Sequence, residues 1–170
     1  MSEVHLELMD KIDAEKVEHF LKILKEKTAD DCTHLHLAIQ SRGGSIPIAL
    51  ALANLLINLS IPITTYNIGN IDSSALVVFA AGNKRICSTK GLFRTHPIGK
   101  EVKGVQTIET LTLLLQEIKE DTKQVSEFLA SRTKITPKNW SEIMHKSVII
   151  SSKEALKMGL VHCIGEYCLK

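Results

Sequence analysis

Two serines at a predicted strand-to-helix junction are the residues best placed to do chemistry. A β-rich run at residues 63–66 changes to a helical period at residues 75–81, and Asp72, Ser73 and Ser74 lie between them. A hydroxyl on such a turn lies near unpaired backbone N–H groups and the positive end of the helix. These groups stabilise an alkoxide and the oxyanion that it generates, so the position suits a nucleophilic serine. Asp72 or Ser73 also fits a plain helix cap, which is a common feature of such junctions.

A glycine-rich loop is the second candidate element. Residues 40–45 read Gln-Ser-Arg-Gly-Gly-Ser, between a predicted strand and a predicted helix that has Pro47 in its first turn. Two adjacent glycines allow the backbone to approach a ligand closely and to aim an N–H group into a site. Gly43 and Gly44 are therefore either donors to a ligand or parts of a plain turn.

One histidine falls at the end of a predicted strand. Residues 92–95 have a strand pattern, and His96 and Pro97 follow them directly. Pro97 fixes the local backbone and prevents the strand from continuing into a central sheet. The imidazole of His96 is therefore expected at a strand end.

The other histidines and the cysteines do not indicate a metal site. His34 and His36 alternate with leucines, no third ligand lies near them in the sequence, and His5 has no partner nearby. We predict that His34 and His36 are half-buried strand residues and that the chain uses no metal and no cofactor. The cysteines lack zinc-site spacing and fit free thiols in a reducing compartment; they are Cys32, Cys87, Cys163 and Cys168.

The rest of the chain alternates predicted strands with predicted helices. Asp13 is expected to cap the first helix, Ser151 and Glu154 have the spacing of a capping box, and Gly69 with Asn70 is expected to form a tight turn;. Strands are predicted at residues 4–8, 35–39, 63–68, 84–87, 92–95, 148–150 and 160–161, and helices after residue 13, at 46–59 and 75–81, from 108, from 137 and at 152–159. Residues 1–170 are thus predicted to form a single α/β domain.

A long amphipathic helix is predicted from Ile108. Apolar residues recur at three- and four-residue steps as far as Leu129, with charged residues on both flanks. A seam of this length has to be buried against another surface. It is either an arm packed against the domain or a surface for another copy of the chain.

Bulk composition narrows the function classes. The chain has 170 residues, of which 44% are apolar and 24% charged, with a formal net charge of +2. This profile is that of an ordinary globular protein and gives no sign of nucleic-acid binding. Residues 1–5 do not resemble a signal peptide, and the most apolar window, residues 46–57, is too short to span a bilayer;. We therefore predict a cytoplasmic protein with no nucleic-acid or membrane partner.

Five motifs together resemble the proteolytic subunit family of Clp proteases. Residues 35–46 are similar to the family segment that ends in Ser-Pro-Gly-Gly, and residues 68–82 are similar to its nucleophile segment. Residues 84–87 match the strand that follows, and His96 falls at the catalytic histidine. Residues 154–161 match the closing Glu-Ala and Gly-Leu-Val signature. The resemblance covers nearly the whole chain with mutually consistent spacings.

The resemblance implies a crotonase-like fold of repeated ββα units, in which the long helix is a handle that joins subunits of a homo-oligomer. It implies a serine endopeptidase that cleaves peptides or unfolded polypeptide segments. Ser73 would be the nucleophile and His96 the general base. The N–H groups of Gly43 or Gly44 and of Ser74 would form the oxyanion hole. An extended peptide would pair with residues 98–99 by β-addition.

The sequence departs from the family pattern at several positions. The catalytic aspartate of the family is replaced by Ser147, and Asp72 is a possible substitute if its turn aims it toward His96. Arg42 stands at the proline of the glycine loop, and residues 74–75 replace a Met-Gly pair. The N-terminal extension of the family does not appear before the first strand, so we do not expect docking onto an AAA+ unfoldase.

Two other functions follow from these departures. A chain without the orienting carboxylate loses orders of magnitude in rate, so a catalytically silent scaffold with the same fold is the alternative. An acyl-CoA enzyme of the wider crotonase superfamily is a remote third, because no suitably placed carboxylate pair is evident.

Overall fold

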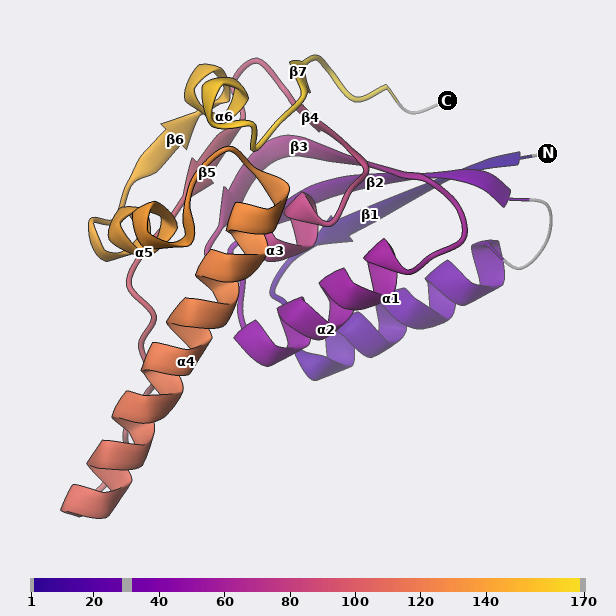
Figure 1. Cartoon of the computed structure of the whole chain (residues 1–170). Coiled ribbons are helices and arrows are strands. Elements are labelled where there is room, and N and C mark those ends of the chain that lie inside the picture. Colours follow the sequence, from indigo (N-terminus) through magenta and orange to yellow (C-terminus); the bar gives the residue numbers. More distant parts are fainter. Residues whose placement is uncertain (1, 29–31, 169–170) are drawn as a thin grey trace.

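The computed structural model describes residues 2–28 and 32–168 (Figure 1). Its main sheet has the strand order β1-β2-β3-β4-β7, and all neighbours along this path are parallel. A further strand, β5, pairs in parallel with β3, and β6 pairs antiparallel with β5. The strands are β1 (Ser2–Met9), β2 (Cys32–Ser41), β3 (Ile63–Asp72), β4 (Lys84–Cys87), β5 (Leu92–Arg94), β6 (Ile149–Ser151) and β7 (Cys163–Ile164).

Helices follow most strands, and α1 and α2 lie together on one face of the sheet (Figure 1). Side chains at the predicted caps hold their first turns: Asp13 accepts the N–H of Lys16, and Ser151 with Glu154 forms a capping box;. The helices are α1 (Ala14–Lys27), α2 (Ile46–Ile57), α3 (Ala75–Ala80), α4 (Ile108–Arg132), α5 (Pro137–His145) and α6 (Ser152–Met158). The prediction of an α/β fold is confirmed.

The β3 strand runs beyond the predicted turn at Gly69 and Asn70, so that prediction is wrong. Residues 64–67 pair with β4 and residues 70–72 pair with β5, with a register shift against β2 between these parts. Asn67 bridges the branch point, because its side chain accepts the N–H of Gly69 and donates to the carbonyl of Leu92, both at 3.0 Å. The glycine and asparagine therefore form an irregularity within a strand.

Two arginines, the buried Arg85 and the half-buried Arg132, hold the end of α3. Arg132 donates to the carbonyls of Ala80, Ala81 and Gly82, and Arg85 also donates to the carbonyl of Gly82. These cations satisfy carbonyls that have no partner within the helix. Burial and the neighbouring Arg132 lower the pKa of Arg85 to about 10, which keeps it charged at neutral pH. The C-cap of α3 is Ala81, in a right-handed helical conformation, although the glycine that follows, Gly82, is the residue type that commonly ends a helix;.

The long helix α4 is continuous and divides into two parts. Its C-terminal part buries Val125 and Leu129, and its N-terminal part projects away from the sheet (Figure 1). Ile108 is 79% exposed, and Leu111 and Leu115 are each 52% exposed. The C-terminal half of the predicted apolar seam thus packs against the domain, and its N-terminal half is exposed. No helix in the described part of the chain is both long and apolar enough to cross a membrane.

The C-terminal strand lies later than predicted. Residues 160–161 are buried but do not pair, and β7 forms at residues 163–164 beside β4. Gly159 takes the left-handed conformation that ends α6, with φ of 71°. The residues after Gly159 lead the chain back to the sheet, so the strand begins later in the sequence than predicted.

Candidate active site

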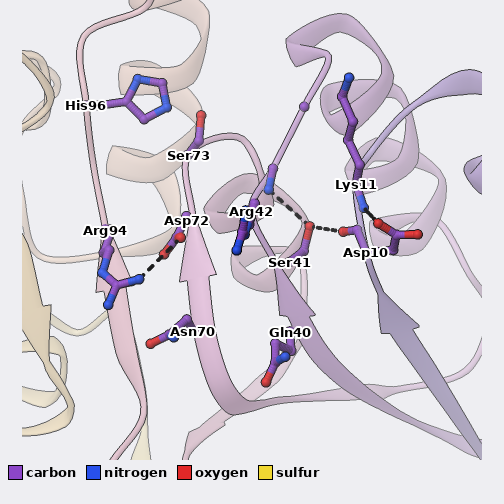
Figure 2. Close-up of a pocket in the computed structure, with 12 residues that line it drawn as sticks. Asp10, Lys11, Gln40, Ser41, Arg42, Asn70, Asp72, Ser73, Arg94 and His96 are labelled. Atoms are coloured by element: carbon purple, nitrogen blue, oxygen red, sulfur yellow. Dashed lines mark hydrogen bonds and ion pairs between the residues drawn. The ribbon is translucent and has the colours of Figure 1, made fainter.

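Four parallel strands end at one edge of the sheet and carry the candidate residues there. The ends of β1, β2, β3 and β5 surround an open cleft of about 580 Å³ (Figure 2). Loops after the carboxyl ends of parallel strands form the binding crevice of open α/β sheets. The lining residues are Asp10, Lys11, Gln40, Ser41, Arg42, Gly43, Gly44, Asn70, Asp72, Ser73, Arg94 and His96.

Ser73 occupies a tight turn between β3 and α3. Its φ of 56° lies in the left-handed region, which is uncommon for serine;. The turn is fixed on both sides, because the N–H of Ser73 donates to the carbonyl of Arg94 at 2.9 Å and its carbonyl accepts the N–H of Leu76 at 3.0 Å. The N-cap residue of α3 is Ser74, with no side-chain cap bond, so neither Asp72 nor Ser73 is the predicted cap. A strained serine held at a helix start is a feature of functional sites.

His96 lies beside Ser73 (Figure 2), and both residues line the cleft and a second, apolar pocket. The Nδ1 of His96 lies 2.8 Å from the carbonyl oxygen of Pro97. A carbonyl only accepts hydrogen bonds, so Nδ1 carries the proton and Nε2 of the neutral ring holds a lone pair. Among the described residues, no hydrogen bond joins this ring to Ser73. The tautomer is nevertheless the one that a general base requires.

Neither candidate third member touches the imidazole. The carboxylate of Asp72 points to Arg94 (Figure 2), whose Nη1 lies 3.6 Å from Oδ2. No hydrogen bond or ion pair links Asp72 to His96 within the described chain. Ser147 is exposed and left-handed, with φ of 53°. The carbonyl of its neighbour Val148 accepts the N–H of Thr95, and the N–H of Val148 donates to the Thr95 hydroxyl, both at 3.0 Å.

The segment that holds Ser147 therefore runs beside the segment that holds His96. Ser147 itself lies outside the linings of both pockets. A longer side chain at this position would start from the neighbouring segment of chain, one residue from the contact between Val148 and Thr95.

The glycine loop packs against the Ser73 turn with no room for a side chain. A Cβ atom on Gly43 would lie 2.7 Å from the carbonyl oxygen of Asp72 and 2.8 Å from the Cβ of Ser73. The φ angles of Gly43 and Gly44, 81° and 158°, also favour glycine;. The loop can reach Ser73 only because both residues are glycines.

The three predicted oxyanion donors differ in their partners. The N–H of Gly43 donates to the hydroxyl of Ser41 at 3.1 Å, and the N–H of Gly44 donates to the hydroxyl of Ser74 at 2.8 Å. The Ser74 hydroxyl in turn donates to the carbonyl of Gly44 at 3.2 Å. For the N–H of Ser74, the described hydrogen bonds include no acceptor. The structure thus brings the three predicted donors together and engages two of them.

An apolar pocket lies on the other side of Ser73 and His96, against α4 and α5. It is closed down to about 20 Å³, roughly the space of one or two waters;. Its walls include Ile98 and Val125, so the residues after His96 and the buried part of α4 form it together. The ammonium group of Lys100 lies 2.7 Å from the carboxylate of Glu117, and this ion pair links the segment after His96 to α4.

The sequence reasoning missed the charged residues of the cleft. Arg94 precedes His96 by two residues on β5, and Asp10 with Lys11 follows β1 directly. Their signal was their position at the carboxyl ends of strands that prove to be parallel neighbours. The order of these strands, which no sequence pattern specified, decides which side chains meet.

Comparisons with known proteins agree with this architecture. The family model described as Clp protease matches residues 1–167. A curated relative, ATP-dependent Clp protease proteolytic subunit 1 of Rhodopirellula baltica, is 26% identical over 144 residues, which is 83% of this chain and 62% of that protein.

A solved structure of a ClpP1 mutant from Listeria monocytogenes matches with a TM-score of 0.85 at 17% identity, over 96% of this chain and 91% of that one. This similarity concerns the fold, which is ClpP-like, as the motifs predicted. The match of the family model over almost the full sequence is the stronger finding. This chain belongs to the Clp protease family.

Proposed function

We propose that the chain is a serine peptidase of Clp type that cleaves peptides or unfolded polypeptide segments. The observation that carries the proposal is the pairing of a strained Ser73, at the start of α3, with an adjacent His96 whose Nε2 lone pair is available. The open cleft of about 580 Å³ has the volume of a ligand site;. Four free cysteines, one of them buried, fit a reducing compartment, so we place the reaction in the cytoplasm;.

The chemistry would follow the general scheme of acyl transfer. Ser73 Oγ attacks the scissile carbonyl while Nε2 of His96 accepts its proton. The N–H of Ser74 donates to the oxyanion, and a glycine N–H joins it once released from its serine;. His96 then gives the proton to the leaving amine. Water hydrolyses the acyl-enzyme by the same steps in reverse.

The carbonyl of Pro97 would take the place of the orienting carboxylate. It holds Nδ1–H at 2.8 Å and so fixes the tautomer. A neutral acceptor stabilises the imidazolium less than an ionised one, because charge-assisted hydrogen bonds are about twice as strong as neutral ones. We therefore infer a slow peptidase. The apolar pocket beside Ser73 and His96 favours a small apolar side chain next to the cleaved bond.

Covalent labelling tests whether Ser73 is a nucleophile. A fluorophosphonate is expected to modify the protein once, and Ser73→Ala is expected to abolish the modification, as measured by intact mass. Ser131→Ala, which removes an exposed hydroxyl near the end of α4, is the control and should label like wild type. A folded protein that takes no label would contradict the proposal and make the catalytically silent scaffold the leading function.

Releasing a glycine N–H should accelerate the reaction. Ser74→Ala removes the hydroxyl that engages Gly44, and the labelling rate constant is expected to rise about tenfold, since one oxyanion donor contributes about a hundredfold or more when fully used;. Ser41→Ala is the matched variant, because it releases Gly43 instead.

The two variants distinguish the glycines. Acceleration by Ser41→Ala alone would assign the donor to Gly43, and acceleration by neither would exclude the glycine loop from the oxyanion hole. Circular dichroism at each step confirms that the loop variants remain folded.

Restoring a carboxylate at residue 147 should also increase activity. In Ser147→Asp the side chain starts beside the segment of His96, and we expect peptide hydrolysis to rise at least about tenfold through stabilisation of the imidazolium;. Ser147→Asn is the control, since asparagine has the same shape without the charge and also tolerates a left-handed backbone;. Equal rates for the two variants would show that the carboxylate does not reach His96.

We also propose that the projecting part of α4 joins copies of the chain into a homo-oligomer. Ile108, Leu111 and Leu115 form an exposed apolar strip on this helix. Proteins rarely leave such a strip in contact with water unless it binds a partner. Extended peptide would pair along residues 98–99, next to the same helix.

Charge placed on the strip should dissociate the oligomer. Leu111→Glu with Leu115→Glu is expected to convert an assembly into monomers in sedimentation velocity at micromolar concentration, because carboxylates would be buried in the interface;. Thr112→Glu with Gln116→Glu adds the same charge one position along the helix and is the control. Monomeric wild-type protein would overturn the proposed oligomer.

A further inference from the structure

A cluster of imidazole and phenol rings lies on the sheet away from the active site. His5 on β1 and His36 on β2 are paired in register, and their rings stack with centroids 4.5 Å apart and planes 9° apart. Alternate residues of the same strands, such as Leu6 and Leu37, belong to the core. The two histidines therefore point to the opposite face from the core side chains.

A carboxylate completes a set of three potential metal ligands. Oε2 of Glu3 lies 3.6 Å from Nε2 of His36. One donor atom from each of Glu3, His5 and His36 lies within 4.8 Å of the other two. The parallel register of β1 and β2 brings these residues together although they are far apart in the sequence.

Two tyrosines support the histidines from behind. Nδ1 of His36 lies 2.8 Å from the hydroxyl of Tyr66, and Nδ1 of His5 lies 3.2 Å from the hydroxyl of Tyr167. A hydroxyl that accepts Nδ1–H leaves the lone pair on Nε2, the atom that binds a metal. Ligating histidines in metal sites have such hydrogen-bond partners on the second ring nitrogen.

We propose that Glu3, His5 and His36 bind one divalent transition-metal ion of zinc type. Two imidazoles and one carboxylate are a ligand set that zinc accepts, with a fourth position left for water. Magnesium and calcium prefer oxygen ligands and would not select this set. From the sequence we predicted no metal, because only ligands that lie near one another in the sequence were considered. The proposed site joins residues that are far apart in the sequence.

The stacked rings of His5 and His36 have to turn before they can hold one ion, because lone pairs in two nearly parallel ring planes do not point to a common position;. Ligand atoms around tetrahedral zinc are about 3.3 Å apart, given bonds of about 2.0 Å. The donors lie within 4.8 Å of one another, so rotations about the side-chain torsions have to bring them about 1.5 Å closer;. Glu3 provides most of this freedom, because its side chain is 52% exposed whereas that of His36 is 16% exposed.

The bound ion would fasten the edge of the sheet. β1 is the outermost strand of the main path, and Tyr167 connects the C-terminal segment to it (Figure 1). The site is separate from the cleft, since His36 precedes Ser41 by five residues, roughly 16 Å along a strand;. The proposal therefore holds or fails independently of peptidase activity.

Calorimetric titration with zinc tests the site. Cys163→Ser with Cys168→Ser is the background, because these thiols lie close to Tyr66 and bind zinc themselves;. We expect one equivalent to bind in the micromolar range or tighter and to raise the melting temperature. His36→Gln and His5→Gln should each weaken binding at least about tenfold.

The control is His34→Gln, which removes an imidazole that lies beside His36, with ring centroids 4.5 Å apart and planes tilted by 30°, but bonds to Thr64. It should retain tight binding, and cobalt bound to it should keep the visible spectrum of a low-coordinate site. Undetectable zinc binding by the folded background protein would overturn the proposal. Binding that persists when both His5 and His36 are replaced by glutamine would overturn it equally.

Discussion

The close approach of Gly43 to the Ser73 turn is the contact on which the candidate site depends. The two loops meet so tightly that a single added methyl group on Gly43 would lie within 3 Å of three atoms of the turn. This contact sets the distance between Ser73 and Gly44, and it also brings Ser74 within bonding reach of that glycine. The left-handed backbone of Ser73 is tolerated because Arg94 holds its N–H from the other side;. The parallel register of β2, β3 and β5 makes both contacts possible.

Most elements could be predicted because their signals are local. The cap at Asp13 and the box at Ser151 act within one helical turn, and the structure has both;. The failures concern residues whose conformation is decided at a distance. Gly69 and Asn70 have the composition of a turn, yet pairing with β5 keeps them in a strand;. The projecting half of α4 has the same seam as its buried half, and only the extent of the domain separates them.

The site divides in the same way. The positions of Ser73 and His96 could be predicted from motif spacing, since Ser73 follows β3 directly and His96 comes two residues after the end of β5. The hydrogen bonds of the site could not be predicted, because the bond between His96 and the Pro97 carbonyl depends on a rotamer, and the Ser74 hydroxyl bonds to Gly44 in a loop thirty residues away. Asp72 is an example. The sequence has its carboxylate next to Ser73, but in the structure this carboxylate pairs with Arg94 on β5 and does not face His96. The cluster of His5 and His36 required the register of two parallel strands.

In the proposed mechanism, the two departures at the site would act on different parts of the same transition state. The neutral acceptor at Pro97 would affect the positive charge that forms on His96, whereas the Ser74 hydroxyl would compete for a donor that faces the negative charge on the substrate;. Opposite charges that develop together in one site stabilise each other, so the two effects need not add. The carboxylate of Ser147→Asp is therefore expected to accelerate the reaction more when a released glycine N–H also stabilises the oxyanion. We therefore expect positive coupling between residues 74 and 147. The double variant Ser74→Ala with Ser147→Asp should increase the rate by more than the product of the two single-variant effects.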